Sequence, residues 1–361
     1  MPKKKQCGYC QEMINPKQRK DKIYCTDKCR KVAHRKEKSK QSRIEKRRSN
    51  LIQNDEMIYI ARQCKKAKTV QILEGHTLES FINLTELIGM KYGRKVNLCH
   101  IAPIKGKGST GLLHERNLYH GGAYQNKKFR NKYYSGGLKI DNGKLLKKWA
   151  VTDDMSTNDV LVKIEEFLVD IIPEYIEISS VKKSRKASIA RKIICHEEHK
   201  IFDNLMECSY KDLADCWAKI NKKKPFILMG KEESKYIAYI DSVNRFIGYG
   251  RKKTLTALRD ILIMGYMALN RVLGSETDNK LFYCKYELLI IPEYGQVMLK
   301  NPGDWSVFKD LIYKTSFKTL QGKRLNVYKF REKVMSYLSF PKKAWQERGL
   351  QYYREHLKKL Q

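Results

Sequence analysis

The chain has 361 residues and a hydrophobic fraction of 42%, which excludes wholesale disorder and allows two or three domains, each with its own core. Its 74 lysines and arginines exceed its 39 aspartates and glutamates and give a formal net charge of +35, which favours a polyanionic partner such as nucleic acid. The most apolar stretch, residues 255–273, contains Arg259, Asp260, Asn270 and Arg271, so no membrane span is predicted.

Four of the ten cysteines lie close together near the start of the chain. Cys7 and Cys10 form a C-x2-C pair, and Cys25 and Cys29 form a C-x3-C pair fourteen residues later. Zn²⁺ prefers four thiolates that converge in a tetrahedron, and two close pairs joined by one short loop supply them. The pattern predicts structural zinc in a treble-clef or ribbon-like finger, with a redox pair or free thiols as the alternative. A closed four-thiolate site leaves no position open for catalysis.

A strongly basic run without proline or glycine follows the second cysteine pair and predicts a helix over residues 30–48. Its basic side chains go all round the helix, so the segment is either a solvated linker or an arm that follows phosphates. Beside a zinc finger we favour the arm, and residues 1–49 form the first predicted domain. The residues expected to contact nucleic acid here are Arg30, Lys31, Arg35 and Lys36.

The next two predicted segments are a helical connector, residues 50–94, and a compact glycine-rich unit, residues 95–149. Within this unit "KVNLCHI" predicts a short strand, "KGKGSTG" a flexible loop and "NLYHGG" a second strand that begins at Asn117. The following "AYQNKKFRNKYY" predicts a helix that presents Asn126 in its first turn. Basic residues of this helix are expected to neutralise phosphates: Lys127, Lys128, Arg130 and Lys132.

Residues 150–361 are predicted to form a mixed α+β domain whose role the sequence does not indicate. An amphipathic helix is expected from a cap at Ser156 to a stop at Pro173. "KYIAYID" and "LFYCKYELLIIPEYGQVML" predict strands, the second with a hairpin turn at residues 292–295, and residues 255–273 predict a buried helix. A surface helix is expected near the C-terminus, over residues 345–360. The whole chain is therefore assigned to the α+β class.

The residues of the glycine-rich unit carry a resemblance to a known family. A histidine closes the first strand, Asn-Leu opens the second, and an asparagine follows nine residues later on a basic helix: His100, Asn117 and Asn126. "HIAP" is similar to the "HI-x-P" that often opens the HNH, or His-Me finger, nuclease motif. The resemblance implies a ββα-metal unit in which His100 is the general base and Asn117 orients the imidazole or holds the loop. It further implies that Asn126 binds a catalytic Mg²⁺ or Mn²⁺.

The unit also departs from the family pattern. Cys99 stands where the family often has an acidic or histidine metal ligand, and thiolates suit Mg²⁺ poorly. Either Cys99 shares the catalytic metal with Asn126, or His114, His120 or Asn131 completes the metal shell, or the metal site is degenerate. The degenerate case leaves a phosphate-binding ββα fold without catalysis.

These features favour a metal-dependent HNH-like endonuclease that hydrolyses DNA phosphodiester bonds and uses the finger to bind DNA. A small finger joined to such a core resembles nucleases of bacteriophages and mobile elements. One alternative is a non-catalytic DNA-binding protein, a transcription or recombination regulator. Another is an RNA-binding or RNA-processing protein, because aromatic residues among the lysines can stack on unpaired bases. Thiols without a signal peptide indicate the cytoplasm, that of a bacterial host if the gene belongs to a phage.

Overall fold

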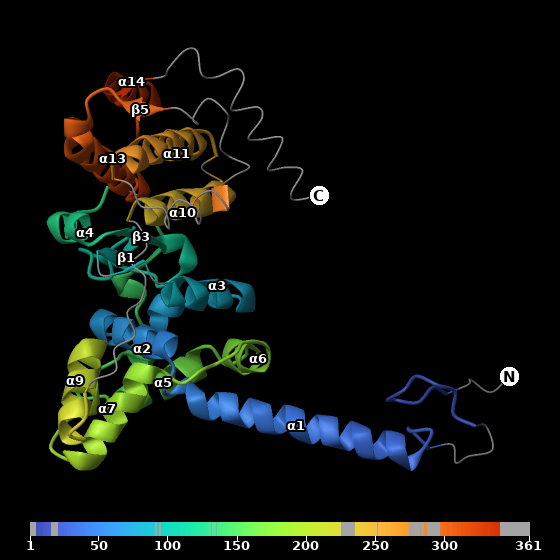
Figure 1. The fold of residues 1–361 in the computed structure, drawn as a ribbon. Coiled ribbons are helices and arrows are strands. Elements are labelled where there is room, and N and C mark those ends of the chain that lie inside the picture. The colour runs from blue at the N-terminus through green and yellow to red at the C-terminus, as the bar shows by residue number, and fades with distance from the viewer. Residues whose placement is uncertain are drawn as a thin grey trace. The chain divides into compact units, whose positions relative to one another are not determined.

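The structure is a computed structural model that describes residues 5–15, 21–90, 92–93, 95–130, 132–134, 136–224, 235–250, 252–273, 282, 285–286 and 297–339. In this part of the chain helices predominate, and three two-stranded antiparallel sheets accompany them, which agrees with the predicted α+β class. The chain divides into two compact units, and each takes two separate segments (Figure 1). Unit 1 contains Met1–Ile58 and Leu168–Pro225, and unit 2 contains Tyr59–Phe167 and Phe226–Gln361. The segment predicted as one C-terminal domain, residues 150–361, therefore contributes to both units.

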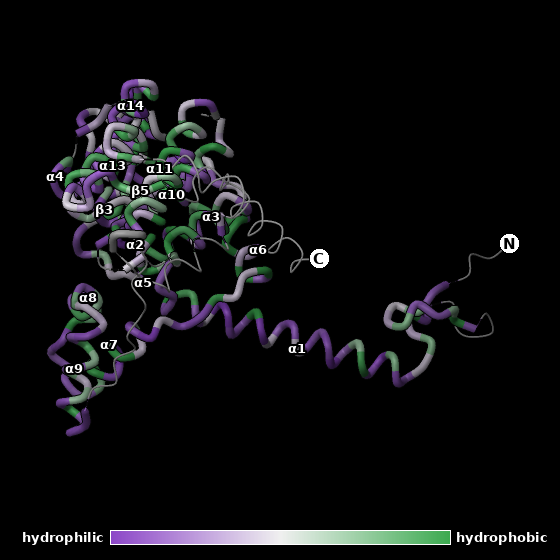
Figure 2. The backbone as a smooth tube through the Cα atoms, turned by 45° about the horizontal axis from the view of Figure 1, so that its top comes forward, coloured by the Kyte–Doolittle hydropathy of each residue, from purple (hydrophilic) through white to green (hydrophobic). Residues whose placement is uncertain are grey.

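Unit 1 contains the long basic helix α1, Asp27–Leu51, whose predicted helical structure is confirmed. The side chain of Thr26 caps its first turn by accepting from the Cys29 N–H. Hydrophilic residues dominate α1 along its length (Figure 2). Its buried residues lie in the last turn, where Asn50 donates to the Val181 carbonyl over 3.1 Å, and one turn earlier Arg47 donates to the Ile176 carbonyl. The remainder of α1 owes its helical form to propensity and capping more than to burial.

A small helical core completes unit 1. Ile58, at the start of α2 (Asp55–Ala67), packs against apolar residues of three helices that follow one another closely in the chain. The helices of the second segment are α6 (Ile171–Ile178), α7 (Arg185–His196), α8 (Phe202–Glu207) and α9 (Tyr210–Ile220).

Unit 2 begins in α2 and contains the predicted glycine-rich region. Its described helices are α3 (Leu78–Gly89), α4 (Ala123–Phe129), α5 (Thr157–Phe167), α10 (Lys235–Gly248), α11 (Lys252–Leu273), α13 (Trp305–Leu320) and α14 (Val327–Tyr337). Its strands are β1 (Val96–His100), β2 (Ser109–Gly111), β3 (Leu118–Gly122), β4 (Lys139–Asp141), β5 (Met298–Leu299) and β6 (Leu338–Ser339). The 3-10 turns are η1 (Val70–Leu73), η2 (Glu115–Asn117), η3 (Asn142–Lys144), η4 (Lys147–Trp149) and η7 (Pro302–Asp304).

Strands β1 and β3 pair antiparallel, with His100 opposite Leu118, and α4 follows β3 directly. The apolar face of this pair joins the large core of unit 2, which α10, α11, α13 and α14 supply. The free edge of β3 is covered by α10: the Gly122 N–H donates to the Tyr239 hydroxyl over 2.9 Å, and the His120 N–H donates to Ser242 Oγ over 3.0 Å. The β1–β3 pair is therefore held from one side by helices that lie more than a hundred residues later.

Several sequence predictions are wrong in the described part of the chain. The residues of "KYIAYID" lie in helix α10 rather than in a strand. The amphipathic helix expected to run to Pro173 ends at Phe167, and Pro173 instead occupies the first turn of α6, where its missing N–H costs no hydrogen bond. The "KGKGSTG" segment is not wholly a loop, because β2 pairs with β4.

Two other predictions, the hairpin turn at residues 292–295 and the helix at residues 345–360, lie outside the described residues. Among the helices that the structure describes, none combines the length and the apolar character needed to cross a bilayer.

Candidate functional site

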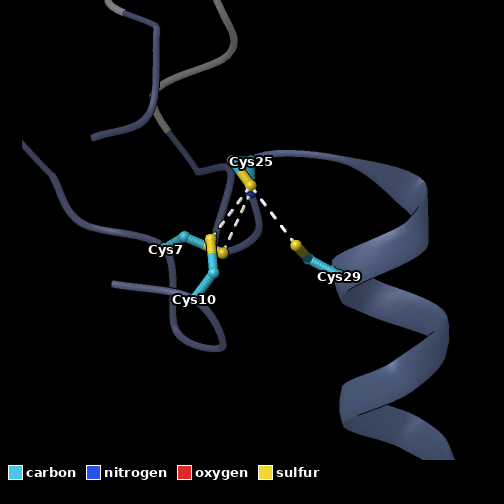
Figure 3. A group of neighbouring side chains, drawn as sticks. All are labelled: Cys7, Cys10, Cys25 and Cys29. Atoms are coloured by element: carbon cyan, nitrogen blue, oxygen red, sulfur yellow. Dashed lines mark hydrogen bonds between the residues drawn. The ribbon is translucent and has the colours of Figure 1, made fainter. Parts of the chain in front are cut away.

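The four N-terminal cysteines converge on one point (Figure 3). Their sulfur atoms all lie within 4.8 Å of one another, and Cys25 Sγ is 3.4 Å from both Cys10 Sγ and Cys29 Sγ. Four thiolates around Zn²⁺, each about 2.3 Å from the ion, would lie about 3.8 Å apart. The sulfur positions are therefore compatible with a structural zinc site.

Local backbone structure places each cysteine pair. The first pair lies in a tight turn closed by the bond from the Cys7 N–H to the Glu12 carbonyl, 2.8 Å, and by the bridge between Gln6 and Met13. Burial alone would raise the pKa of the Cys7 thiol, but backbone N–H groups of Cys10, Cys25 and Tyr9 donate to its sulfur and lower that pKa to about 6. Such donors stabilise a thiolate, which is the form that binds metal.

The second pair places Cys29 in the first turn of α1, where the helix dipole also favours a negative sulfur. The four basic residues predicted to contact nucleic acid follow at once, and all are exposed: Arg30, Lys31, Arg35 and Lys36. Lys36 lies over the ring of Tyr9, with its Nζ 4.8 Å from the ring centroid. The segment that contains the cysteine cluster and the start of the basic helix are thus in direct contact.

His100 lies at the end of β1, where the sequence predicts it. Its carbonyl accepts from the Gln321 amide over 2.8 Å. In the part of the chain that is described, its Nε2 is buried and has no hydrogen-bond partner. Burial and, after it, the charge of Lys66 lower the pKa of His100 to about 3. At neutral pH the ring is therefore uncharged and a weak proton acceptor.

Asn117 is fully buried and makes three hydrogen bonds with its side-chain amide. Its Oδ1 accepts from the Ala102 N–H over 2.9 Å, and its Nδ2 donates to the carbonyls of Ala102, 3.2 Å, and Leu112, 2.7 Å. These bonds join the start of β3 to both ends of the loop that follows β1. The side chain therefore holds the loop, which is one of the two roles that the resemblance implies.

The loop around Asn117 is closely packed at two glycines. Gly137 has a φ of +73°, and a Cβ there would collide with Asn117 Oδ1 and the Ala102 nitrogen. At Gly111 a Cβ would collide with the Ala102 carbonyl. Only glycine lets these backbones approach Ala102 and Asn117 so closely. The predicted flexible loop, residues 105–111, therefore ends at Gly111 in a closely packed contact with Ala102.

The structure does not join the other predicted catalytic residues to His100. Cys99 is buried in the main core, its thiol donates to the Asn97 carbonyl, and burial raises its pKa to about 12. Successive side chains of a strand point to opposite faces, so Cys99 and His100 diverge. Asn126 lies on α4, and between it and His100 no hydrogen bond is present among the described residues.

The residues considered for completing the metal shell also lie elsewhere. His114 is stacked on His76, and His120 contacts the ring of Tyr92. Asn131 is outside the described residues. No group of three or more histidine, cysteine or acidic side chains surrounds His100 within the described ranges. The donor set at the end of β1 does not fit Mg²⁺ or Mn²⁺, which prefer several oxygen ligands.

The basic residues predicted on and after α4 are exposed: Lys127, Lys128, Arg130 and Lys132. Lysines of α13 and of the turn after it belong to the same surface, which the sequence alone did not predict. Burial is the first cause that lowers the pKa of Lys318, and repulsion by neighbouring ammonium groups adds to it, those of Lys314, Lys323, Lys132 and Lys128. We call these five residues, with Lys318 at their centre, the α4–α13 lysine cluster. Only the spacing of four or five residues between the lysines of α13 hinted at it in the sequence.

Aromatic rings accompany the α4–α13 lysine cluster. Lys318 Nζ lies 5.6 Å from the Phe129 ring centroid, and Lys128 Nζ lies 5.7 Å from that of Tyr124. Tyr124 exposes 65% of its surface, and Tyr133 and Tyr134 are also exposed. The surface thus offers ammonium groups for phosphates and ring faces for bases or sugars.

Comparisons with protein-family models, curated proteins and solved structures gave no match to this chain.

Proposed function

We propose that this protein binds nucleic acid through the phosphate backbone, with DNA as the expected partner. The α4–α13 lysine cluster carries the proposal. Five ammonium groups brought together by two separate segments repel one another, and burial of Lys318 adds a desolvation cost. A polyanion removes the repulsion and releases its own counterions, which is the main electrostatic source of binding to nucleic acid.

The finger and α1 provide the second basic surface of the proposal. We infer that Cys7, Cys10, Cys25 and Cys29 hold one structural Zn²⁺, because their sulfurs already lie near tetrahedral spacing. The ion would fix the start of α1 and the exposed Arg30, Lys31, Arg35 and Lys36. With few apolar residues nearby, the metal is the main source of order for this segment.

A salt titration of binding tests the proposal. Replacing Lys128, Lys132 and Lys318 by glutamine should weaken duplex binding at low salt and flatten the log–log salt dependence, by roughly 0.9 for each phosphate that is no longer neutralised. The control replaces three exposed lysines that do not belong to the cluster, Lys211, Lys219 and Lys329, and removes the same charge. Equally weakened binding in the two triple variants would show that net charge, not the cluster, drives binding.

Competition between duplex DNA and single-stranded RNA then identifies the partner. Exposed Tyr124, Tyr133 and Tyr134 beside the cluster would favour unpaired bases, which is the basis of the RNA-binding alternative. If single-stranded RNA displaces duplex DNA at equal nucleotide concentration, RNA replaces DNA as the proposed partner.

Phosphodiester hydrolysis by an HNH-like site is the second candidate function. One observation favours it: the buried Nε2 of His100, which has no hydrogen-bond partner in the described part of the chain, stands at the end of β1, beside the loop that Asn117 holds. His100 would take a proton from the attacking water. We derive no step through a divalent metal, because the side chains near His100 do not form a fitting donor set.

A plasmid-nicking assay with Mg²⁺ or Mn²⁺, and EDTA as control, tests this candidate. General-base removal costs roughly 10²- to 10⁴-fold in rate, so His100→Ala should abolish nicking and leave binding nearly unchanged. His120→Ala is the histidine control on the neighbouring strand. Wild-type protein that binds DNA but nicks none of its forms would exclude hydrolysis and leave the binding function.

A further inference from the structure

Two histidines and a glutamate meet in unit 2, and this group shares no residue with the cysteine group or with the end of β1. His76 immediately precedes the N-cap of α3, whereas His114 and Glu115 lie at the start of η2. The ligand atoms that the three side chains offer lie within 4.8 Å of one another. His114 and Glu115 are buried, and the rings of His76 and His114 stack with their centroids 4.7 Å apart.

The hydrogen bonds of His76 leave a lone pair on its Nδ1. Nε2 lies 2.9 Å from the Leu113 carbonyl, which can only accept, so Nε2 carries the hydrogen of the neutral ring. Ser80 Oγ lies 2.7 Å from Nδ1, but its single hydrogen can also go to the Thr77 carbonyl, 3.0 Å away. A ring N–H donated to a backbone carbonyl, with the other nitrogen free, is the usual state of a metal-binding histidine.

His114 and Glu115 place two further lone pairs face to face. His114 Nδ1 accepts from the Arg116 N–H over 3.2 Å, so this nitrogen carries no hydrogen. Glu115 Oε2 lies 2.7 Å from the same nitrogen, and within the described part of the chain it has no hydrogen-bond partner. Two buried acceptors at this distance repel each other unless a proton or a metal cation lies between them.

We propose that His76, His114 and Glu115 bind one divalent transition-metal ion of the zinc class. Two imidazoles and one carboxylate suit zinc and its neighbours, whereas Mg²⁺ and Ca²⁺ prefer ligand sets made of oxygen. The ion joins the start of α3 to the segment before β3, so its role is structural. Because the rings are nearly parallel, at 11°, one of them turns on binding so that both nitrogens face the ion.

Metal content of the full-length protein tests the proposal. After dialysis against excess zinc and removal of loosely bound ions, elemental analysis should find about two equivalents per chain, one in each site. Glu115→Gln and His76→Gln should each lose about one equivalent and keep the thiolate-bound ion. Cys25→Ser should lose the thiolate-bound ion and keep the second one. His196 is exposed on α7, and the control His196→Ala should keep both ions. Circular dichroism establishes that the variants are folded.

Cobalt substitution of the wild-type protein gives an answer that needs no variant. Cobalt in the cysteine site absorbs strongly through thiolate charge transfer, whereas cobalt bound by nitrogen and oxygen shows only weak ligand-field bands. The proposal expects both signals, and the weak bands remain in Cys25→Ser. Wild-type protein that takes up a single ion, with thiolate character only, overturns it. Neither result depends on whether the protein binds nucleic acid.

Discussion

Asn117 shows how one side chain can fix a loop without taking part in chemistry. Its amide offers an acceptor and two donors, and the backbone of Ala102 and Leu112 uses all three. An aspartate would lack the donors, and a leucine of similar size would leave three buried backbone groups without partners. The asparagine at the start of β3 is therefore explained by hydrogen bonding.

We expect Asn117→Ala to lower the free energy of unfolding by about 3 kcal/mol, since it leaves several buried backbone groups unsatisfied. Urea denaturation followed by circular dichroism measures the change. Asn126→Ala is the matched control: Asn126 is partly exposed on α4, and its replacement should change stability by no more than about 0.5 kcal/mol. Equal effects of the two substitutions would contradict the role assigned to Asn117.

His100 should make the folded state sensitive to acid. Its pKa is about 3 in the folded protein, lowered by burial and by Lys66, and about 6.5 in an unfolded chain. Between these values only the unfolded chain takes up the proton, so the free energy of unfolding falls as pH drops below about 6.5. Relative to His100→Gln, the free energy of unfolding of the wild type should fall by up to about 1.4 kcal/mol for each unit by which the pH is lowered. Parallel stability curves of the two proteins between about pH 6 and pH 4 would contradict this.

At the scale of elements, the helices and strands that could be predicted are those whose pattern is contained in a short stretch of neighbouring residues. Helix α1 was predictable from its run of helix formers, and β1 and β3 from short alternating segments near glycine. Helix α10 was not, because the seven residues considered alternate like a strand. Extending the window to Val243 and Phe246 reveals apolar residues at helical spacing, all of them buried in the core.

Among the candidate sites, too, those made of residues close together in the sequence were predicted, and those made of distant residues were not. The cysteine pairs are local and were found, whereas the α4–α13 lysine cluster and the contact between His76 and His114 depend on residues far apart in the chain. Nothing in the spacing of His76 relates it to Glu115. The direction of side chains was also not considered in the prediction. Cys99 and His100 are adjacent in sequence and were predicted to act together, but side chains alternate along a strand, and that of Cys99 is buried in the core.

Neutralising the start of α1 should weaken binding in a salt-dependent way. Arg30, Lys31, Arg35 and Lys36, each replaced by glutamine, should reduce the slope of the log–log salt dependence by roughly 0.9 for every phosphate that the helix no longer neutralises. Affinities of variant and wild type should then converge at high salt. Fluorescence anisotropy with labelled duplex DNA gives both quantities. An unchanged slope would assign α1 the role of a solvated linker.

At the scale of the molecule, the proposed metal sites and the basic surfaces are distributed between two units with separate cores. The cysteine cluster and α1 belong to unit 1, and the β1–β3 pair, the α4–α13 lysine cluster and the pair of His76 and His114 belong to unit 2. Damage to the finger should therefore remain local.

Cys29→Ser should release the finger's ion and unfold residues up to about the first turn of α1, while the cores of both units stay folded. Hydrogen exchange read by mass spectrometry should show new exchange in residues 5–29 and unchanged protection in α7 and α10. Cys208→Ser, an exposed cysteine outside the finger, is the control. Reduced protection in α10 would mean that the finger supports unit 2 as well.

The interleaved path of the chain has a consequence for its synthesis on the ribosome. Residues up to Ile58 emerge well before the helices that pack on them, which follow only after residue 168. Strands β1 and β3 likewise emerge more than a hundred residues before α10 and α13, which cover their apolar face. Neither unit can complete its hydrophobic core until its second segment has been translated. The nascent chain therefore exposes apolar surface for much of its synthesis. Such a chain is a natural client of ribosome-associated chaperones, and slow translation would prolong its exposure to aggregation.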